Sequence, residues 1–283
     1  MIPVSEMVPR VLNFRANPSH RRAPIEVVVG GFRASNKAFV APTNLDCFVD
    51  NRLPVDQGGT GSCEGCSHAA GLYVAMAAAG TPLPWLPSQD GAYKVARCIE
   101  RGGANRSLED SGTESSYVCL GFNLWGIRAM GLRAQDPGDA APRNSDCSVL
   151  TVNDEPTLSE LEADAQNVFV GQYNAEGTDH GSRIAAVNLS LSRGYPCTVG
   201  GFVDTDYMRW EPTDGVYEWA DTKDPDGGGH SQLIIGNRIN SAGSFEYLIL
   251  NSWGAWCQNG RIWVSQQFIL DADEITALHV RKA

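Results

Sequence analysis

A chain of 283 residues with 42% hydrophobic and 19% charged residues has an ordinary globular composition, long enough for one large domain or two closely packed halves. Its apolar stretches are too short to cross a bilayer, so we expect no membrane span and no membrane partner. The net charge of -11 would repel phosphate backbones, which argues against nucleic acid as a partner.

Residues 1–41 mix Pro, Arg, Ser and Asn and contain one apolar, strand-like run at 25–29. They predict an N-terminal extension that covers an edge strand, docks an assembly partner or blocks a cleft of the molecule. The first residues lack the basic-then-apolar pattern of a secretory signal, so we expect no signal peptide. Eight scattered cysteines are too few for a disulfide scaffold in a chain of this length, although a bridge between Cys98 and Cys147 remains open.

A glycine-bearing segment at 55–66 predicts a loop that delivers a cysteine to the start of a helix. Glycines at 58, 59 and 61 allow tight turning, and no proline follows Cys63 until Pro82. The positive end of the helix dipole favours a thiolate, which is the nucleophilic form of cysteine. Gln57 could donate its amide to an oxyanion beside the Cys63 backbone N–H.

Two further helices are predicted before the middle of the chain. Ser88 can cap a helix from Gln89 to about Glu100, and Gly112 with Thr113 opens another that ends near residue 131. Residues 132–155 are rich in Pro, Asp, Asn and Gly and predict a connection. We therefore expect a helical half over about 56–150.

The rest of the chain, about 151–283, predicts a β-rich half. A capping box at 157–160 and a run at about 181–193 indicate helices. Alternating runs then predict an antiparallel, barrel-like set of strands at 198–203, 232–239, 245–250, 261–264 and 275–280. The acidic loop 221–227 lacks the regular spacing of a calcium loop, so we expect a solvated turn and no metal.

Two later motifs complete a pattern with the cysteine segment. His230 follows a glycine turn at the start of a strand-like run, and residues 251–254 read Asn-Ser-Trp-Gly. Together with Gln57 and Gly61-Ser62-Cys63, these segments resemble papain-like cysteine peptidases, particularly their bacterial and viral relatives, over residues 42–283. The resemblance implies a papain-like α+β fold, with a cleft between a helical half and an antiparallel β-barrel half.

The resemblance also implies a role for each motif in hydrolysing a peptide or protein substrate without a cofactor. Cys63 would attack, His230 would exchange the proton, Asn251 would orient the ring and Gln57 would complete the oxyanion hole. The candidates for substrate contact are Gly112, Ser231 and Trp253, of which Trp253 would also shield the His230 to Asn251 hydrogen bond.

Several departures from the family pattern accompany this prediction. Glu64 replaces the usual aromatic residue after the nucleophile and is expected beside the cleft, where it would disfavour the thiolate and acidic substrates. Cys66 is a rival nucleophile, but three residues further along it would face the core.

Two other functions stay open beside a cysteine endopeptidase. One is a structural or binding component, for example of a phage particle, and the other is an amidase or acyl transferase acting on a cell-wall peptide or another non-protein substrate. We expect a cytoplasmic or virion-associated protein.

Overall fold

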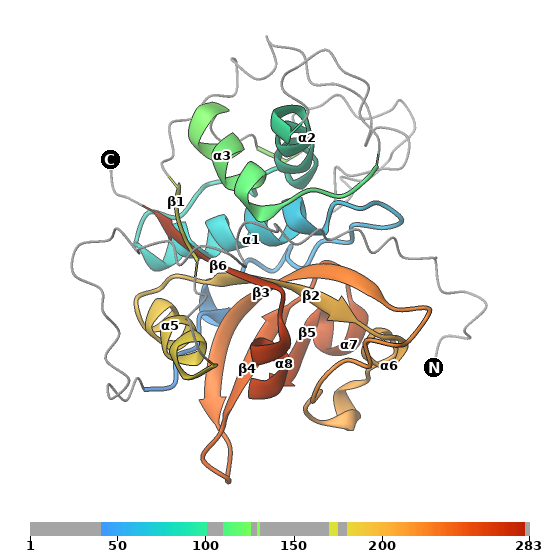
Figure 1. Ribbon diagram of the computed structural model, residues 1–283. Coiled ribbons are helices and arrows are strands. Elements are labelled where there is room, and N and C mark those ends of the chain that lie inside the picture. The colour runs from blue at the N-terminus through green and yellow to red at the C-terminus, as the bar shows by residue number, and fades with distance from the viewer. Residues whose placement is uncertain (1–40, 101–109, 126–128, 131–169, 175–179, 281–283) are drawn as a thin grey trace.

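The computed structural model describes residues 41–100, 110–125, 129–130, 170–174 and 180–280. In Figure 1, three helices lie on one side of a curved antiparallel sheet. Residues 1–40 of the predicted extension, the whole predicted connection at 132–155 and the capping box at 157–160 lie outside the described residues. None of the described helices is long and apolar enough to cross a bilayer.

The central element is α1 (Cys63–Ala78), which packs between the other helices and the sheet. Its small residues allow this close approach. A Cβ added at Gly71 would lie 2.3 Å from Leu278, and one added at Gly65 would lie 2.6 Å from the carbonyl oxygen of Gln89. The predicted buried helix after Cys63 is therefore confirmed.

Helix α2 (Gln89–Glu100) has the predicted bounds, and Ser88 caps it by accepting the Gly91 N–H at 2.8 Å. Helix α3 (Ser115–Trp125) is shorter than predicted. Residues 112–114 precede it in extended or irregular conformation, and Gly112 has a φ of 72°, which ends any helical path there. Helix α5 (His180–Ser192) lies within a residue of its predicted bounds.

The sheet has six strands in the order β1-β6-β2-β3-β4-β5. Their bounds are β1 (Val170–Asn174), β2 (Cys197–Val203), β3 (Gly228–Ile239), β4 (Phe245–Leu250), β5 (Arg261–Ser265) and β6 (Glu274–Val280). All five strand pairings are antiparallel. The five predicted strands are confirmed, whereas β1 was not predicted.

The predicted barrel-like half is a curved antiparallel sheet that stays open. Closure would require β1 to pair with β5, but β1 contacts α3 on the helical side. The edge of β5 instead meets Tyr217, whose N–H donates to the Trp263 carbonyl at 2.9 Å. A curved open sheet with helices on one side remains within the predicted α+β class.

Three short helices missed by the sequence analysis support the other face of the sheet. They are α6 (Thr205–Met208), α7 (Trp256–Asn259) and α8 (Gln266–Asp271). An aromatic cluster lies among them and includes Tyr207, Tyr217 and Trp253, with ring centroids 4.9 to 5.9 Å apart. The cluster reaches the site described next, because Trp253 belongs to both.

Candidate active site

Cys63 is the first residue of α1, and the residues around it hold the helix start in place. Gly61 donates its backbone N–H to both carboxylate oxygens of Asp110, at 2.9 and 3.0 Å. The N–H of Cys66 donates to the Ser62 carbonyl at 2.9 Å, which begins the helical ladder. These contacts fix a fully buried thiol at the N-terminal end of a 16-residue helix.

The Cys63 thiol meets strand β3. The backbone N–H of Ser231 forms a hydrogen bond with the Cys63 sulfur, and Ser231 directly follows His230. Two segments far apart in sequence therefore meet at this point. The candidate nucleophile lies beside the strand that carries the candidate base.

The His230 ring is held by Asn251 and Trp253. His230 Nε2 lies 2.7 Å from Asn251 Oδ1, and the indole of Trp253 stacks on the ring with centroids 4.6 Å apart and planes 19° apart. The Ser252 N–H also donates to Asn251 Oδ1, at 2.7 Å. Because a backbone N–H can only donate, that amide atom is the oxygen, and His230 Nε2 must carry the proton. Neutral His230 therefore has its lone pair on Nδ1.

Gln57 is buried between the cysteine loop and the Asn-Ser-Trp-Gly segment. Its Nε2 donates to the Thr60 carbonyl at 2.9 Å, and its Oε1 accepts from the Ser252 hydroxyl at 2.5 Å. Its backbone N–H donates to the Ser252 carbonyl at 2.9 Å, and the Gly254 N–H donates to the Val55 carbonyl at 3.1 Å. This ladder joins the two sides of the site and fixes which way the amide group faces.

The environment of Cys63 disfavours an isolated thiolate. Burial raises the pKa of the Cys63 thiol well above its usual range, and the Glu64 carboxylate raises it further. The backbone N–H groups of Ser231 and Glu64 lower that pKa, but they do not reverse the shift. The sequence-based expectation that the helix start would favour the thiolate omits this cost of burial. A thiolate here needs a nearby positive charge.

Solved structures with a similar fold come from a bacterium, an insect and a plant. Xylellain, a cysteine protease from Xylella fastidiosa, matches with a TM-score of 0.59 and 19% identity over 96% of this chain and 92% of that one. Digestive procathepsin L 3 from the larval midgut of Tenebrio molitor matches with a TM-score of 0.59 and 17% identity over 88% and 72% of the two chains. Bromelain protease from Ananas comosus, solved with the E64 inhibitor, matches with a TM-score of 0.56 and 16% identity over 85% and 99%.

The chain has the papain-like fold. No protein-family model and no curated protein matches the sequence. At these identities, the likeness to solved structures shows the fold and leaves the roles of individual residues as proposals.

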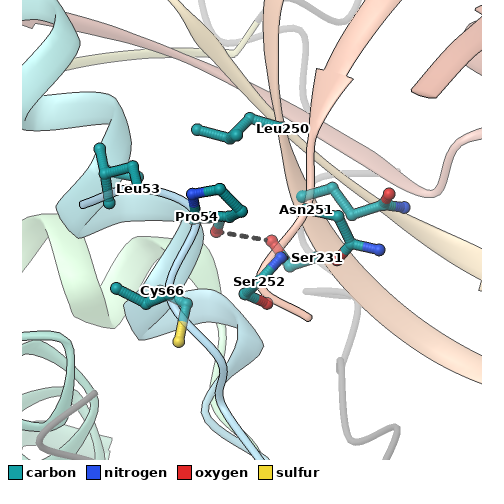
Figure 2. Close-up of a pocket in the computed structure, with 11 residues that line it drawn as sticks. Leu53, Pro54, Cys66, Ser231, Leu250, Asn251 and Ser252 are labelled. Carbon is teal, nitrogen blue, oxygen red and sulfur yellow. Dashed lines mark hydrogen bonds between the residues drawn. The ribbon is translucent and has the colours of Figure 1, made fainter. Parts of the chain in front are cut away.

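Within the papain-like fold, Cys66 lies behind the candidate nucleophile. Its thiol donates to Gln89 Oε1 at 3.3 Å and lies 3.7 Å from Ser62 Oγ. Figure 2 shows the Cys66 sulfur directed away from Ser231 and Asn251. The cavity in that view measures about 10 Å³, which is room for about one water. Cys66 therefore lines an internal space too small for substrate.

The three residues predicted to contact substrate are all buried. Gly112 donates its N–H to the Tyr93 hydroxyl at 2.9 Å, so this N–H is engaged within the protein. The Ser231 hydroxyl lies 2.9 Å from Ser67 Oγ, on the α1 side of the sheet. Trp253 covers the His230 ring with its indole. Their observed contacts are internal, and the substrate contacts and the shielding role of Trp253 stay predictions.

Glu64 lies in the interior, so the expectation that it borders the cleft is wrong. Its side chain is 1% exposed, and its Oε2 forms an ion pair with His68 Nδ1 at 3.0 Å. The physical reason is helical spacing, because residues four apart on α1 lie on the same face and here that face is covered by α3 and the sheet. The sequence analysis considered Glu64 without His68 and missed this pair.

In the acidic loop before β3, a carboxylate accepts hydrogen bonds from nearby backbone and hydroxyl groups. Asp224 accepts from the Thr205 N–H and hydroxyl at 2.7 and 2.6 Å, and from the Asp226 N–H at 3.0 Å. Within the described residues, no group of three or more His, Cys, Asp or Glu side chains could hold a metal ion.

Proposed function

We propose that this protein hydrolyses peptide bonds in peptide or protein substrates, with Cys63 as the nucleophile. The observation that carries the proposal is the contact between the Cys63 sulfur and the Ser231 N–H, next to a His230 ring whose Nε2 is bonded to Asn251. It is supported by the fold, because xylellain and bromelain are described as proteases. The proposal also assigns a residue to each of the four roles that thiol hydrolysis needs, namely nucleophile, base, orienting group and oxyanion donor.

In the first step, His230 Nδ1 takes the proton from the Cys63 thiol. The resulting imidazolium supplies the positive charge that the buried thiolate requires, so the two charges form together. The Nε2–H of His230 keeps its hydrogen bond to Asn251 Oδ1 throughout, which holds the ring in one orientation. The thiolate then attacks the substrate carbonyl carbon, and the carbonyl oxygen takes the electron pair.

In the proposed mechanism, the oxyanion receives hydrogen bonds from the Cys63 backbone N–H and from Gln57 Nε2. One Gln57 N–H is held by the Thr60 carbonyl, and the amide carries a second N–H for the oxyanion. The imidazolium protonates the leaving amine as the carbon–nitrogen bond breaks. Water, deprotonated by His230, then hydrolyses the thioester and restores the thiol.

The test is labelling with the epoxide inhibitor E64, followed by mass spectrometry to locate the adduct. We expect one adduct, on Cys63, and loss of peptide cleavage in proportion to labelling. The Cys63→Ala variant is the control for reagent that reacts elsewhere. A sole adduct on another cysteine, or an absence of both labelling and cleavage in folded protein, would overturn the proposal.

Two substrate panels separate peptide hydrolysis from the related amide chemistries. A denatured protein such as casein tests endopeptidase activity, and purified cell-wall peptides test an amidase or acyl transferase. Cleavage of casein that depends on Cys63 supports the proposal. Turnover confined to the cell-wall panel would assign the same thiol to the other reaction.

A further inference from the structure

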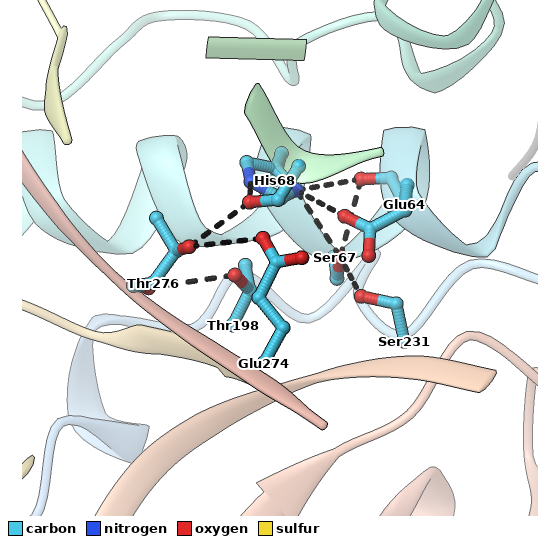
Figure 3. A network of polar contacts seen from close by, with 8 residues as sticks. Glu64, Ser67, His68, Thr198, Ser231, Glu274 and Thr276 are labelled. Atoms are coloured by element: carbon cyan, nitrogen blue, oxygen red, sulfur yellow. Dashed lines mark hydrogen bonds and ion pairs between the residues drawn. The ribbon is translucent and has the colours of Figure 1, made fainter. Parts of the chain in front are cut away.

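A buried polar network lies directly behind the candidate nucleophile (Figure 3). It joins α1, α3 and three strands of the sheet, and each member is nine-tenths or more buried. The members are Glu64, Ser67, His68, Ser115, Thr198, Ser231, Glu274 and Thr276. Two carboxyl groups and one imidazole in such an interior require mutual compensation, because an uncompensated buried charge is costly.

One part of the network compensates the charge of Glu64. His68 Nδ1 lies 3.0 Å from Glu64 Oε2, and His68 Nε2 lies 2.8 Å from Ser115 Oγ. Ser115 Oγ in turn donates to Thr276 Oγ1 at 3.1 Å. The imidazole thus has a polar partner on each nitrogen, and the arrangement suits a doubly protonated, positively charged ring.

The other part of the network reaches the candidate active site. Ser67 Oγ donates to the Glu64 carbonyl at 3.1 Å and lies 2.9 Å from Ser231 Oγ. The Ser231 hydroxyl also forms a hydrogen bond with the Glu64 carboxylate. Glu64 directly follows Cys63, and Ser231 directly follows His230. The residues next to the nucleophile and the base are therefore bonded to each other.

We propose that the Glu64–His68 ion pair, acting through Ser67 and Ser231, positions the Cys63 thiol against strand β3 and sets the charge that the thiol experiences. This inference rests on the proposed role of Cys63. Glu64 and His68 are positioning residues in it, since they act through their neighbours and not on substrate.

The titratable groups that face this pair come from three elements. Cys63 neighbours it on α1, Cys119 faces His68 from α3, and Glu274 faces Glu64 from β6. Burial alone would lower the pKa of His68, but the Cys119 thiol and the Glu64 carboxylate raise that pKa well above its usual value. Burial raises the pKa of Glu64, while His68 acts in the opposite direction. We infer an imidazolium and a carboxylate at neutral pH.

The experiment measures the alkylation rate of Cys63 by iodoacetamide as a function of pH, with mass spectrometry to identify the residue. The midpoint is the pH at which the alkylation rate of Cys63 reaches half its maximum. Glu64→Gln removes a negative charge beside the thiol and keeps the side-chain shape, so this midpoint should fall by about one pH unit. His68→Gln leaves the carboxylate uncompensated, so the midpoint should rise. Opposite shifts are the signature of the charge pair, because general loosening of the site would move both variants in the same direction.

The neighbouring helix α2 offers a matched control. Asp90 and Lys94 form a buried ion pair with the same spacing at 2.9 Å, on a helix that does not carry the thiol. Asp90→Asn should leave the Cys63 midpoint unchanged. The inference would be overturned if the alkylation midpoint moved in the same direction in the Glu64 and His68 variants. It would also be overturned if the midpoint stayed unchanged in either variant.

Two provisions keep the test decisive. Thermal unfolding and circular dichroism establish that each variant folds. If either substitution prevents folding, Ser67→Ala replaces it, because it removes only the hydroxyl between the Glu64 carbonyl and Ser231, and an unchanged midpoint then contradicts the inference. Alkylation needs no turnover, so a failed E64 experiment alongside opposite midpoint shifts would reject the proposed function and retain the charge pair.

Discussion

The two sides of the candidate site are built by different means. On the sheet side, the His230 ring is held by one short segment, through a hydrogen bond that its Nε2–H donates to Asn251 Oδ1 and through stacking against Trp253. On the helical side, the start of α1 is held by the carboxylate of Asp110, which precedes α3 and lies 49 residues from Gly61 in sequence. The proposed charge pair of Glu64 and His68 depends on burial of α1 by α3 and the sheet. The orientation of the base is thus locally determined, whereas the environment of the nucleophile depends on tertiary packing.

The largest effect should come from the nucleophile itself. Cys63→Ala should abolish hydrolysis, because among the described residues only this thiol combines a helix start with the Ser231 N–H and the His230 strand. Cys66→Ala should keep most of the activity, since that thiol is directed at Gln89 and away from Ser231 and Asn251. The measurement is peptide turnover, with circular dichroism to verify folding. Comparable losses in both variants would show that the helical side is assigned to the wrong cysteine.

Gln57→Ala should reduce turnover by about a hundredfold, the usual cost of one oxyanion donor. The change should fall on kcat and leave KM nearly constant, because the amide acts on charge that develops only in the transition state. Ser252→Ala is the matched comparison, since it removes the hydroxyl that holds Gln57 Oε1 but leaves the donor in place. It should cost less than Gln57→Ala. A loss confined to KM would instead assign Gln57 to substrate binding.

The burial of Cys197 in strand β2 should make the protein less stable in alkali. Burial raises the pKa of Cys197 to about 12, against about 8.5 for an exposed thiol in the unfolded chain. The folded thiol therefore keeps its proton while the unfolded one ionises, so this contribution is intact below about pH 8.5 and declines as pH rises toward 12. At pH 10 the loss should be about 2 kcal/mol.

The corresponding measurement is urea unfolding of wild type and Cys197→Ala at pH 7 and pH 10. The variant should lose about 2 kcal/mol less than the wild type between the two pH values. Cys47→Ala, at an exposed position, is the control. An identical pH dependence in wild type and Cys197→Ala would mean that water reaches this strand.

The same contrast explains what the sequence could predict. Strands β2 to β6 and helix α2 follow from local alternation and capping, so their predicted positions agree with the structure to within a few residues. That the sheet stays open could not be predicted, because closure depends on where β1 pairs, and the five residues of β1 carry no pattern that predicts contact with α3. The four-residue helix α6 was missed because it is short and its cap depends on tertiary support. Asp204 accepts the Tyr207 N–H, and the same carboxylate is held by the Tyr217 hydroxyl.

Residue types in the candidate site were easier to predict than their surroundings. The order and chemistry of Gln57, Cys63, His230 and Asn251 lie in short motifs, and the structure brings the segments that carry them together. The burial of Glu64 could not be predicted from its charge. It depends on how α3 and the sheet pack on α1, which decides the face of the helix that water cannot reach. The spacing of Glu64 and His68 on one helix was the available signal, since residues four apart lie on the same face.

The smallest effect should come from Asn251, and it distinguishes orientation from charge on the sheet side. Asn251→Ala removes one hydrogen bond from His230 Nε2, but the stacked Trp253 indole and the strand remain. The imidazolium can still form beside Cys63, so the pH midpoint of Cys63 alkylation should move by less than about one unit. His230→Ala removes the positive charge altogether. Burial and Glu64 then act unopposed by that charge, and the midpoint should rise above the ordinary thiol value of about 8.5.

Wild type and Asn251→Ala should therefore both react below pH 7, whereas His230→Ala should react only in alkali. Turnover should follow the same order, with a larger loss for His230→Ala because that variant also lacks the acid for the leaving amine. The Cys63→Ala protein shows how much reagent reaches other thiols. If His230→Ala retained the wild-type alkylation profile, His230 could not be the partner of Cys63. A large shift in Asn251→Ala would mean that this single hydrogen bond, and not the stacked indole, holds the ring in place.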